Sequence, residues 1–198
     1  MSSPPLPIVM AITGASGAPY AVRLLEQLLL ATQPVQLIVS SHGLRLLRTE
    51  TEIDSIDALR DAVGATRWDG LVTLFDDGDR GAAPASGSAR NRGMVICPCS
   101  MGTVSAISHG TSRSLVERAA DVALKERRPL VVVPRESPYS VIHLENMLRL
   151  TRAGAVVLPA SPGFYHRPTS IAELVDFVVA RILDQLDVEH ALGKRWGD

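Results

Sequence analysis

Two short loops combine glycine with hydroxyl-bearing residues directly before a predicted helix, a composition that suits anion binding. The first, Gly14-Ala15-Ser16-Gly17, follows the apolar run 8–13. The second, Ser100-Met101-Gly102-Thr103, follows the apolar run 94–97. Backbone N–H groups and the positive end of a helix dipole favour a phosphate at such positions. Tight strand-to-helix turns and helix N-caps use the same residue types. The two loops together favour a ligand with one phosphate and several other polar edges, which FMN has.

The spacing argues against two common uses of a glycine-rich turn. The loop 14–17 lacks the GxGxxG pattern of dinucleotide sites, and the next predicted strand ends at Ser40 instead of an acid that would hold a ribose diol. The loop also lacks the G-x-S-x-G spacing of a nucleophile elbow. NAD and a nucleophilic serine are therefore disfavoured.

Cationic side chains in the second half of the chain could bind a second anion. Arg118 and Lys125 are seven residues apart on one face of a predicted helix, with Asp121 between them and able to pair with either. Such a row is usually a solvated surface. Arg135 directly follows a continuously apolar run, at the ligand-binding end of a predicted strand, where an anion clamp is the better interpretation. The adjacent Glu136 could pair with that arginine or act in proton transfer.

The histidines and cysteines predict no metal site. The five histidines show no H-x-x-x-H or carboxylate spacing. The two cysteines, Cys97 and Cys99, lack a second pair to complete a zinc set and would strain the backbone as a disulfide. We expect two reduced, buried thiols whose side chains point the same way along an extended segment.

Short apolar runs alternate with helical patterns along the chain. Strands that are apolar throughout form parallel sheets that are covered on both faces. The sequence therefore predicts an α/β protein: a single doubly wound domain over residues 1–198, with a mainly parallel sheet of flavodoxin-like or Rossmann-like type. Residues 42–63 are predicted as one polar helical stretch, and residues 76–92 as a long loop of functional or mobile character. Ligands bind beyond the carboxyl ends of such strands, where the candidate residues lie.

Composition and charge narrow the range of partners. The chain has 198 residues, of which 46% are hydrophobic and 21% charged, and this excludes a disordered or collagen-like protein. Its formal charge of -1 provides no global field for nucleic acid or an anionic membrane. No apolar run approaches the roughly 18 residues that cross a bilayer, and the first residues lack a signal-peptide pattern. We expect a cytoplasmic protein.

Taken in order along the chain, these motifs resemble the UbiX family of flavin prenyltransferases, which belongs to a wider group of flavodoxin-like FMN proteins that includes cysteine decarboxylases. The resemblance covers nearly the whole chain, and the joint order of its motifs makes it specific. The matching segments are Thr13-Gly-Ala-Ser-Gly17, Pro84-Ala-Ser-Gly-Ser88, Cys97-Pro-Cys-Ser-Met-Gly-Thr103, Glu117-Arg-Ala-Ala-Asp-Val-Ala-Leu-Lys-Glu-Arg-Arg-Pro129, Val133-Pro-Arg-Glu136, Pro162-Gly-Phe-Tyr-His166 and Val175-Asp-Phe-Val-Val-Ala-Arg181.

The resemblance implies a reaction and its participants. A dimethylallyl group would pass from dimethylallyl monophosphate to N5 and then C6 of reduced FMN, without a metal, and the prenylated FMN would serve a UbiD-type decarboxylase. The residues implied for FMN are Gly14, Ala15, Ser16, Ser40, Ser100, Met101, Gly102, Thr103 and Arg135. Those implied for the prenyl phosphate are Arg118, Lys125, Tyr165 and Arg181. The implied polar groups around the reacting atoms are Ser16, Glu50 and Glu136.

Two departures from the family pattern and two alternative functions stay open. Residues 79–83 offer no aromatic ring before Pro84, where the family commonly has a tryptophan, which leaves the prenyl-chain specificity open. Residues 111–114 lack the expected asparagine and add a cation, Arg113. The alternatives are an FMN-dependent decarboxylase that acts directly on a small acid and a non-catalytic FMN-binding subunit. The family's dodecamers predict a homo-oligomer, with Trp196 either as an assembly contact or in a tail folded back on its own domain.

Overall fold

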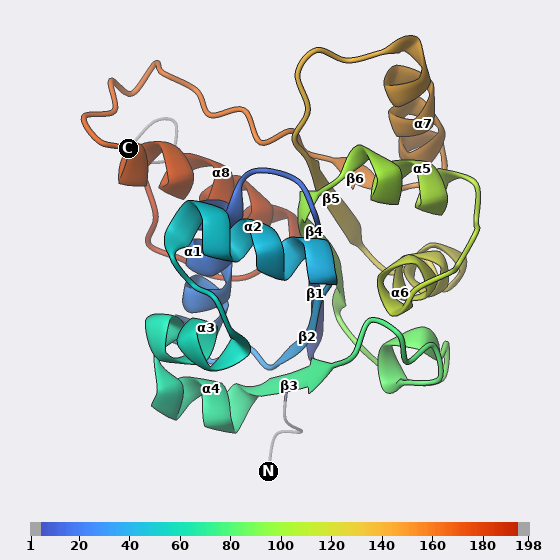
Figure 1. The fold of residues 1–198 in the computed structure, drawn as a ribbon, viewed down its shortest axis with the longest axis horizontal. Helices are drawn as coiled ribbons and strands as arrows, with labels where there is room; N and C mark the ends of the chain where they lie inside the picture. The colour runs from blue at the N-terminus through green and yellow to red at the C-terminus, as the bar shows by residue number, and fades with distance from the viewer. Residues whose placement is uncertain (1–4, 194–198) are drawn as a thin grey trace.

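Six parallel strands form one sheet in the order β3-β2-β1-β4-β5-β6 (Figure 1). The computed structural model describes residues 5–193. The order reverses between β1 and β4, as it does in doubly wound sheets of the Rossmann type, so the predicted fold class is confirmed. The strands are β1 (Ile8–Ile12), β2 (Val35–Val39), β3 (Val72–Phe75), β4 (Gly93–Cys99), β5 (Leu130–Pro134) and β6 (Val156–Val157).

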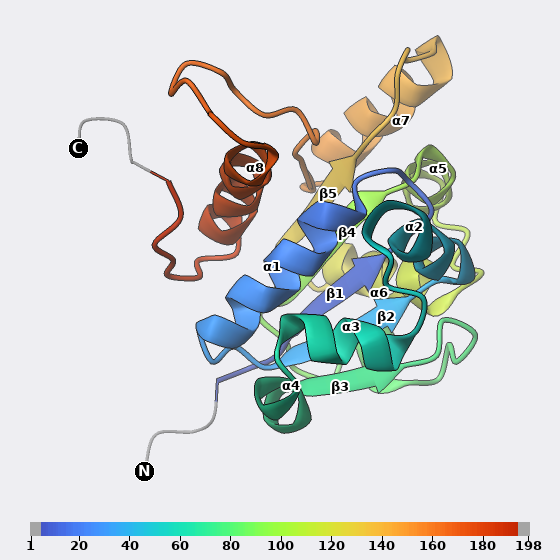
Figure 2. The same ribbon diagram turned by 60° about the vertical axis from the view of Figure 1, so that its left-hand side comes forward.

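Helices cover both faces of this sheet (Figure 2). One layer holds α1 (Ala18–Leu30), α2 (Ser41–Thr51), α3 (Ile56–Val63), α4 (Ala65–Leu71) and α8 (Ile171–Gln185). The other holds the short 3-10 turn η1 (Ala83–Ala85), α5 (Met101–Ser108), α6 (Leu115–Lys125) and α7 (Val141–Arg152). The strands β1, β4 and β5 are covered on both sides, so every residue in them can be buried, whereas the edge strands β3 and β6 are partly exposed.

Alternate residues of the strands supply two separate cores. In β1, Ile8, Met10 and Ile12 pack with α1 and α8, while Val9 and Ala11 pack with α5 and α6. Each of these five side chains is at most 1% exposed. The period of two along a strand sends neighbours to opposite faces, so a single apolar run serves both helical layers.

The segment 42–63 differs from the single helical stretch predicted for it. It forms α2 and α3, and the third helix of this region, α4, lies beyond the predicted stretch. Glu52 ends α2 in a left-handed conformation with φ of 62°, and the Ser55 hydroxyl then caps α3 by accepting a hydrogen bond from Ala58 N at 3.1 Å. Residues 44–63 contain neither glycine nor proline, so their composition gave no sign of this break.

The two cysteines are free and fully buried, as predicted, but they do not share a face. Cys97 packs in the core beneath α1 and α8, and Cys99 packs in the core beneath α5 and α6. The pairing of β4 with β5 shifts register between Ile96 and Cys99, which breaks the alternation that an undistorted strand would impose. Burial raises the pKa of both thiols, so they are neutral near pH 7.

Candidate active site

Three helix N-termini meet at one cavity of about 240 Å³ beyond the carboxyl ends of the strands. Ser40, Ser100 and Ser114 are the N-cap residues of α2, α5 and α6, and all three line the cavity. Their hydroxyls accept hydrogen bonds from first-turn N–H groups at 3.0, 3.2 and 3.4 Å. Three positive dipole ends and several hydroxyls make this cavity a site for an anion such as a phosphate.

Two carboxylates also line this cavity, but each is already hydrogen-bonded. Asp77 Oδ1 accepts from Val116 N at 3.0 Å. Glu117 accepts from Arg113 N at 2.7 Å and from the Thr111 hydroxyl at 2.9 Å. Burial alone would raise the pKa of Glu117, but these bonds and the Arg113 side chain outweigh burial and lower it. The negative charge of both residues is therefore matched by donors in the first turn of α6 and in the segment just before it.

The buried Thr13 joins the ends of the two central strands. Its hydroxyl donates to Pro98 O at 3.0 Å and accepts from Ser100 N at 2.9 Å. Gly14 follows it and lies so close to α2 that an added Cβ would be 2.5 Å from His42 Cβ. The loop after β1 is thereby held against the N-termini of both α2 and α5.

Gly43 brings α2 against the end of β1, and we expect Gly43→Ala to destabilise the protein. A Cβ there would lie 2.4 Å from the Ile12 carbonyl oxygen. Overpacking of this kind costs about 1–3 kcal/mol in free energy of unfolding, which exceeds the gain of about 1 kcal/mol in helix propensity. The matched control is Gly70→Ala in α4, where an added Cβ has no neighbour within 4 Å. Urea unfolding should show lower stability for Gly43→Ala only; equal stability of the two variants would contradict this contact.

Ser16, Glu50 and Arg135 form a second polar group at the same edge of the sheet. Glu50 Oε2 accepts hydrogen bonds from Gly17 N and Ala18 N, each at 2.8 Å, and so occupies the N-terminus of α1. The Ser16 side chain is hydrogen-bonded to the same carboxylate, and Arg135 acts on it through its charge. Burial alone would raise the pKa of Glu50, but these interactions outweigh burial and lower it. Glu50 is therefore an ionised acceptor near pH 7.

The lowered pKa predicts how stability depends on pH at Glu50. A carboxylate whose pKa is lower in the folded state stabilises the fold above its unfolded pKa of about 4.3, and this stabilisation is lost as the pH falls through the folded pKa. At pH 7 we expect Glu50→Gln to lower the free energy of unfolding by about 1 kcal/mol, the usual value of a helix cap. The deficit should shrink below about pH 4. The control is Glu145→Gln, an exposed residue of α7, and a deficit that is independent of pH would contradict this role.

The structure gathers most of the residues predicted for FMN. Gly14, Ser40, Ser100 and Thr103 line the cavity. Ala15, in the loop after β1, and Met101, the first residue of α5, are buried beside it, at 6% and 7% exposed. Seven lining residues were outside the set predicted for FMN: Thr13, Ser41, His42, Asp77, Ser114, Val116 and Glu117. Ser114 carried a signal, since the spacing S-x-x-E to Glu117 is typical of a helix N-terminus.

Two of the four residues predicted for the prenyl phosphate lie on α6. Arg118 pairs with Asp121 at 2.6 Å, and Lys125 pairs with the adjacent Glu126. Of the two partners considered for Asp121, Arg118 and Lys125, the structure therefore has Arg118. The Lys125 ammonium also approaches Gly87, because a Cβ there would lie 2.8 Å from it. Arg128, two residues before the start of β5, donates a hydrogen bond from Nη2 to Gly87 O at 2.6 Å. Lys125 therefore lies near the amino ends of the strands, opposite the cavity.

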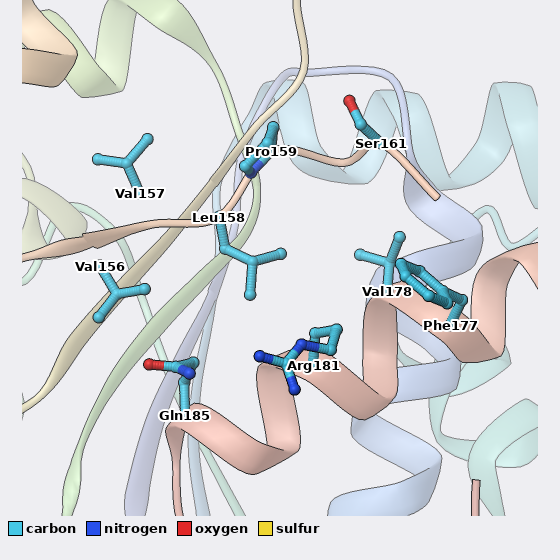
Figure 3. Close-up of a pocket in the computed structure, with 9 residues that line it drawn as sticks. All are labelled: Val156, Val157, Leu158, Pro159, Ser161, Phe177, Val178, Arg181 and Gln185. Carbon is cyan, nitrogen blue, oxygen red and sulfur yellow. The ribbon is translucent and has the colours of Figure 1, made fainter. Parts of the chain in front are cut away.

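The other two lie beside a second cavity, of about 340 Å³, between β6 and α8 (Figure 3). Arg181 extends into it from α8. Tyr165 contacts Phe177, a lining residue, in an edge-on ring pair with centroids 5.8 Å apart. The Ala160 N–H donates to Pro134 O at 3.1 Å, so the loop that carries Tyr165 begins beside Arg135.

Glu136 is half-buried in the turn after β5 and accepts a hydrogen bond from Ser137 N at 3.1 Å. Within residues 5–193, Glu136 forms no ion pair with Arg135, which was one of its two roles considered from sequence. The charge of Arg135 acts on Glu50 instead. Trp196 lies outside the described residues. No helix in the part of the chain from residue 5 to 193 is long and apolar enough to span a membrane.

Fold and site together define a doubly wound α/β protein with an anion site at the carboxyl edge of its sheet. Residues 2–183 match the family model described as Flavoprotein. The flavin prenyltransferase UbiX of Pseudomonas aeruginosa is 50% identical over 99% of this chain and 96% of its own. That of Halalkalibacterium halodurans is 49% identical over 94% of this chain and 91% of its own. The chain belongs to the Flavoprotein family and, within it, to the UbiX flavin prenyltransferases.

Solved structures agree with this assignment. A UbiX protein in complex with FMN and dimethylallyl pyrophosphate has a TM-score of 0.85 and 38% identity, covering 96% of this chain and 100% of its own. A dodecameric FMN-dependent UbiX-like decarboxylase from Escherichia coli O157:H7 has a TM-score of 0.88 and 39% identity, covering 98% and 100%. The cysteine decarboxylase TvaF, at 15% identity, shares the fold alone.

Proposed function

We propose that this protein transfers a dimethylallyl group from dimethylallyl monophosphate to N5 and C6 of reduced FMN and so makes prenylated FMN. The observation that carries the proposal is the 50% identity to a flavin prenyltransferase over nearly the full length of both chains. A relative with 38% identity has been solved with FMN and a dimethylallyl phosphate ester together, which supports the same pair of substrates.

The residues at the carboxyl edge of the sheet fit FMN. The cavity with three N-caps would take its phosphate, and Ser40, Ser100 and Thr103 would donate or accept hydrogen bonds there. Gly14, Ala15, Ser16, Met101, Gly102 and Arg135 would complete the set. The glycine at position 14 fits this role because the backbone approaches α2 too closely for any side chain. Reduced FMN supplies the electron-rich N5 and C6 atoms that receive the allyl group.

The protein's own side chains would act on charge and protons. Breaking the allylic C–O bond leaves positive charge on carbon and sends the electron pair to the phosphate, which cations stabilise without a metal. Arg118, Lys125, Tyr165 and Arg181 would bind that phosphate. Ser16, Glu50 and Glu136 would lie near the reacting atoms. Since the pKa of Glu50 is lowered, its role there is that of an ionised acceptor that orients Ser16.

Three further parts of the proposal rest on the family relationship. We place the enzyme in the cytoplasm as one domain over residues 1–198. The product would pass to a UbiD-type decarboxylase. The chain would assemble into a homo-oligomer, as the dodecameric relative from Escherichia coli does.

The test is an anaerobic incubation of purified protein with reduced FMN and dimethylallyl monophosphate, followed by mass spectrometry of the released flavin. A flavin heavier by one five-carbon unit is expected. The pyrophosphate is run in parallel because the solved relative contained that ester. An Aquifex aeolicus relative with 41% identity is named phenylacrylic acid decarboxylase, so release of carbon dioxide from that acid is the competing assay. Unmodified FMN together with carbon dioxide release would favour a decarboxylase.

A further inference from the structure

Asp184 links Arg181 to a histidine in the last described segment. One carboxylate oxygen of Asp184 accepts from Arg181 Nη1 at 2.8 Å, and the other lies 3.2 Å from His190 Nε2. The side chain of His190 is 5% exposed, whereas that of Arg181 is 56% exposed. The buried His190 is therefore connected through the Asp184 carboxylate to the exposed guanidinium of Arg181.

The backbone fixes which nitrogen of His190 carries the proton. Leu192 N donates to His190 Nδ1 at 3.2 Å, so Nδ1 acts as an acceptor. In the neutral ring the proton is then on Nε2, and this N–H donates to Asp184. Leu192 in turn packs against the core beneath α1 and α8. The ring is thus oriented by the segment that follows α8.

The Arg181 guanidinium lines the cavity between β6 and α8 together with Ser161, Gln185 and otherwise apolar residues (Figure 3). It carries five N–H donors, and the contact with Asp184 uses Nη1. The other donors can bind a phosphate while Asp184 restricts the side chain to one orientation. A long arginine side chain without such a partner would lose about 2 kcal/mol of rotamer entropy when it binds an anion.

We propose that Asp184 and His190 are positioning residues for Arg181, holding its guanidinium ready for the phosphate of the prenyl donor. This inference rests on the proposed function, which gives Arg181 its anion. It assigns a role in substrate affinity to the segment after α8, which lies far along the chain from the glycine-rich loops.

The experiment compares three changes in the FMN-loaded full-length protein. We expect His190→Leu and Asp184→Asn to raise the Kd for dimethylallyl monophosphate, measured by calorimetry, by about fivefold, the scale of a part-exposed ion pair. His190→Gln retains an N–H for Asp184 and should stay within about twofold of the wild type. The KM for the same donor should follow the Kd, with kcat little changed, because Arg181 would bind the phosphate before and during transfer.

The control is Asp187→Asn, which makes the same change of charge three residues further on, at a carboxylate paired with Arg92. It should leave the Kd unchanged. In an Arg181→Ala background, His190→Leu should cause no further rise in the Kd.

A merely structural role would lower the melting temperature without this coupling, and an unchanged Kd in His190→Leu would overturn the inference. If Arg181→Ala itself leaves the Kd unchanged, the proposed role of Arg181 fails first. Donor binding without prenyl transfer would count against the proposed function alone.

Discussion

We expect Arg135→Glu to lower kcat/KM for prenyl transfer by at least about a hundredfold. This is the usual loss of rate when one preorganised electrostatic group is removed from an active site. Arg135 follows β5 at the carboxyl edge of the sheet, and its charge acts on Glu50. Reversing that charge would place two carboxylates together at the point where the proposed reaction needs a cation beside an anionic flavin. The effect should appear both as weaker FMN binding, by fluorescence titration, and as lost turnover.

The control for this change is Arg67→Glu. Arg67 is exposed on α4, the helix that leads into the amino end of β3. Arg67→Glu therefore makes the same change of charge at the opposite edge of the sheet. We expect the turnover of this variant to be within about twofold of the wild type. Wild-type turnover in Arg135→Glu would remove Arg135 from the site, whereas equal losses in both variants would indicate a general effect of net charge.

The sequence predicted those parts of the site that depend on local pattern. An apolar run followed by glycine and serine defines a strand, a turn and a helix, so this pattern alone places Gly14 and Ser100 at one edge of the sheet. The convergence of Ser40, Ser100 and Ser114 on one cavity follows from the parallel sheet, because the N-termini of the helices that follow parallel strands lie at the same edge.

Contacts between distant segments were beyond the reach of the sequence pattern. Glu50 lies at the end of a helix without a distinctive motif, and only the path of the chain after β2 brings it to the N-terminus of α1. The opposite orientation of Cys97 and Cys99 likewise depends on a shift in strand register. The network of Arg181, Asp184 and His190 joins α8 to a segment without regular structure, for which periodicity carries no information.

The placement of Lys125 leads to a prediction about the assembly. Lys125 is the last residue of α6, about 15 Å along the helix axis from the N-terminus that faces the cavity. One chain therefore does not bring Lys125 and Ser16 together. If Lys125 binds the prenyl phosphate, as its motif implies, it must do so in the site of another copy. We expect Lys125→Ala to reduce transfer by about a hundredfold or more while FMN binding in the same protein stays normal.

Mixed oligomers test whether the residue acts between copies. Lys125→Ala and Arg135→Glu subunits, each nearly inactive alone, are co-expressed with different tags and purified through both. When Lys125 serves a neighbouring site, random mixing in a symmetric oligomer leaves about a quarter of the sites with both residues intact. When Lys125 and Arg135 serve the same chain's site, every subunit remains defective and mixing restores nothing.

The matched control pairs Lys125→Ala with the Lys125→Ala/Arg135→Glu double variant, which cannot form an intact site in either arrangement. Recovered turnover in the first mixture alone would show that a site is built from more than one chain. No recovery, in mixtures whose size by light scattering matches the wild type, would instead require α6 to move for Lys125 to reach the phosphate of its own chain.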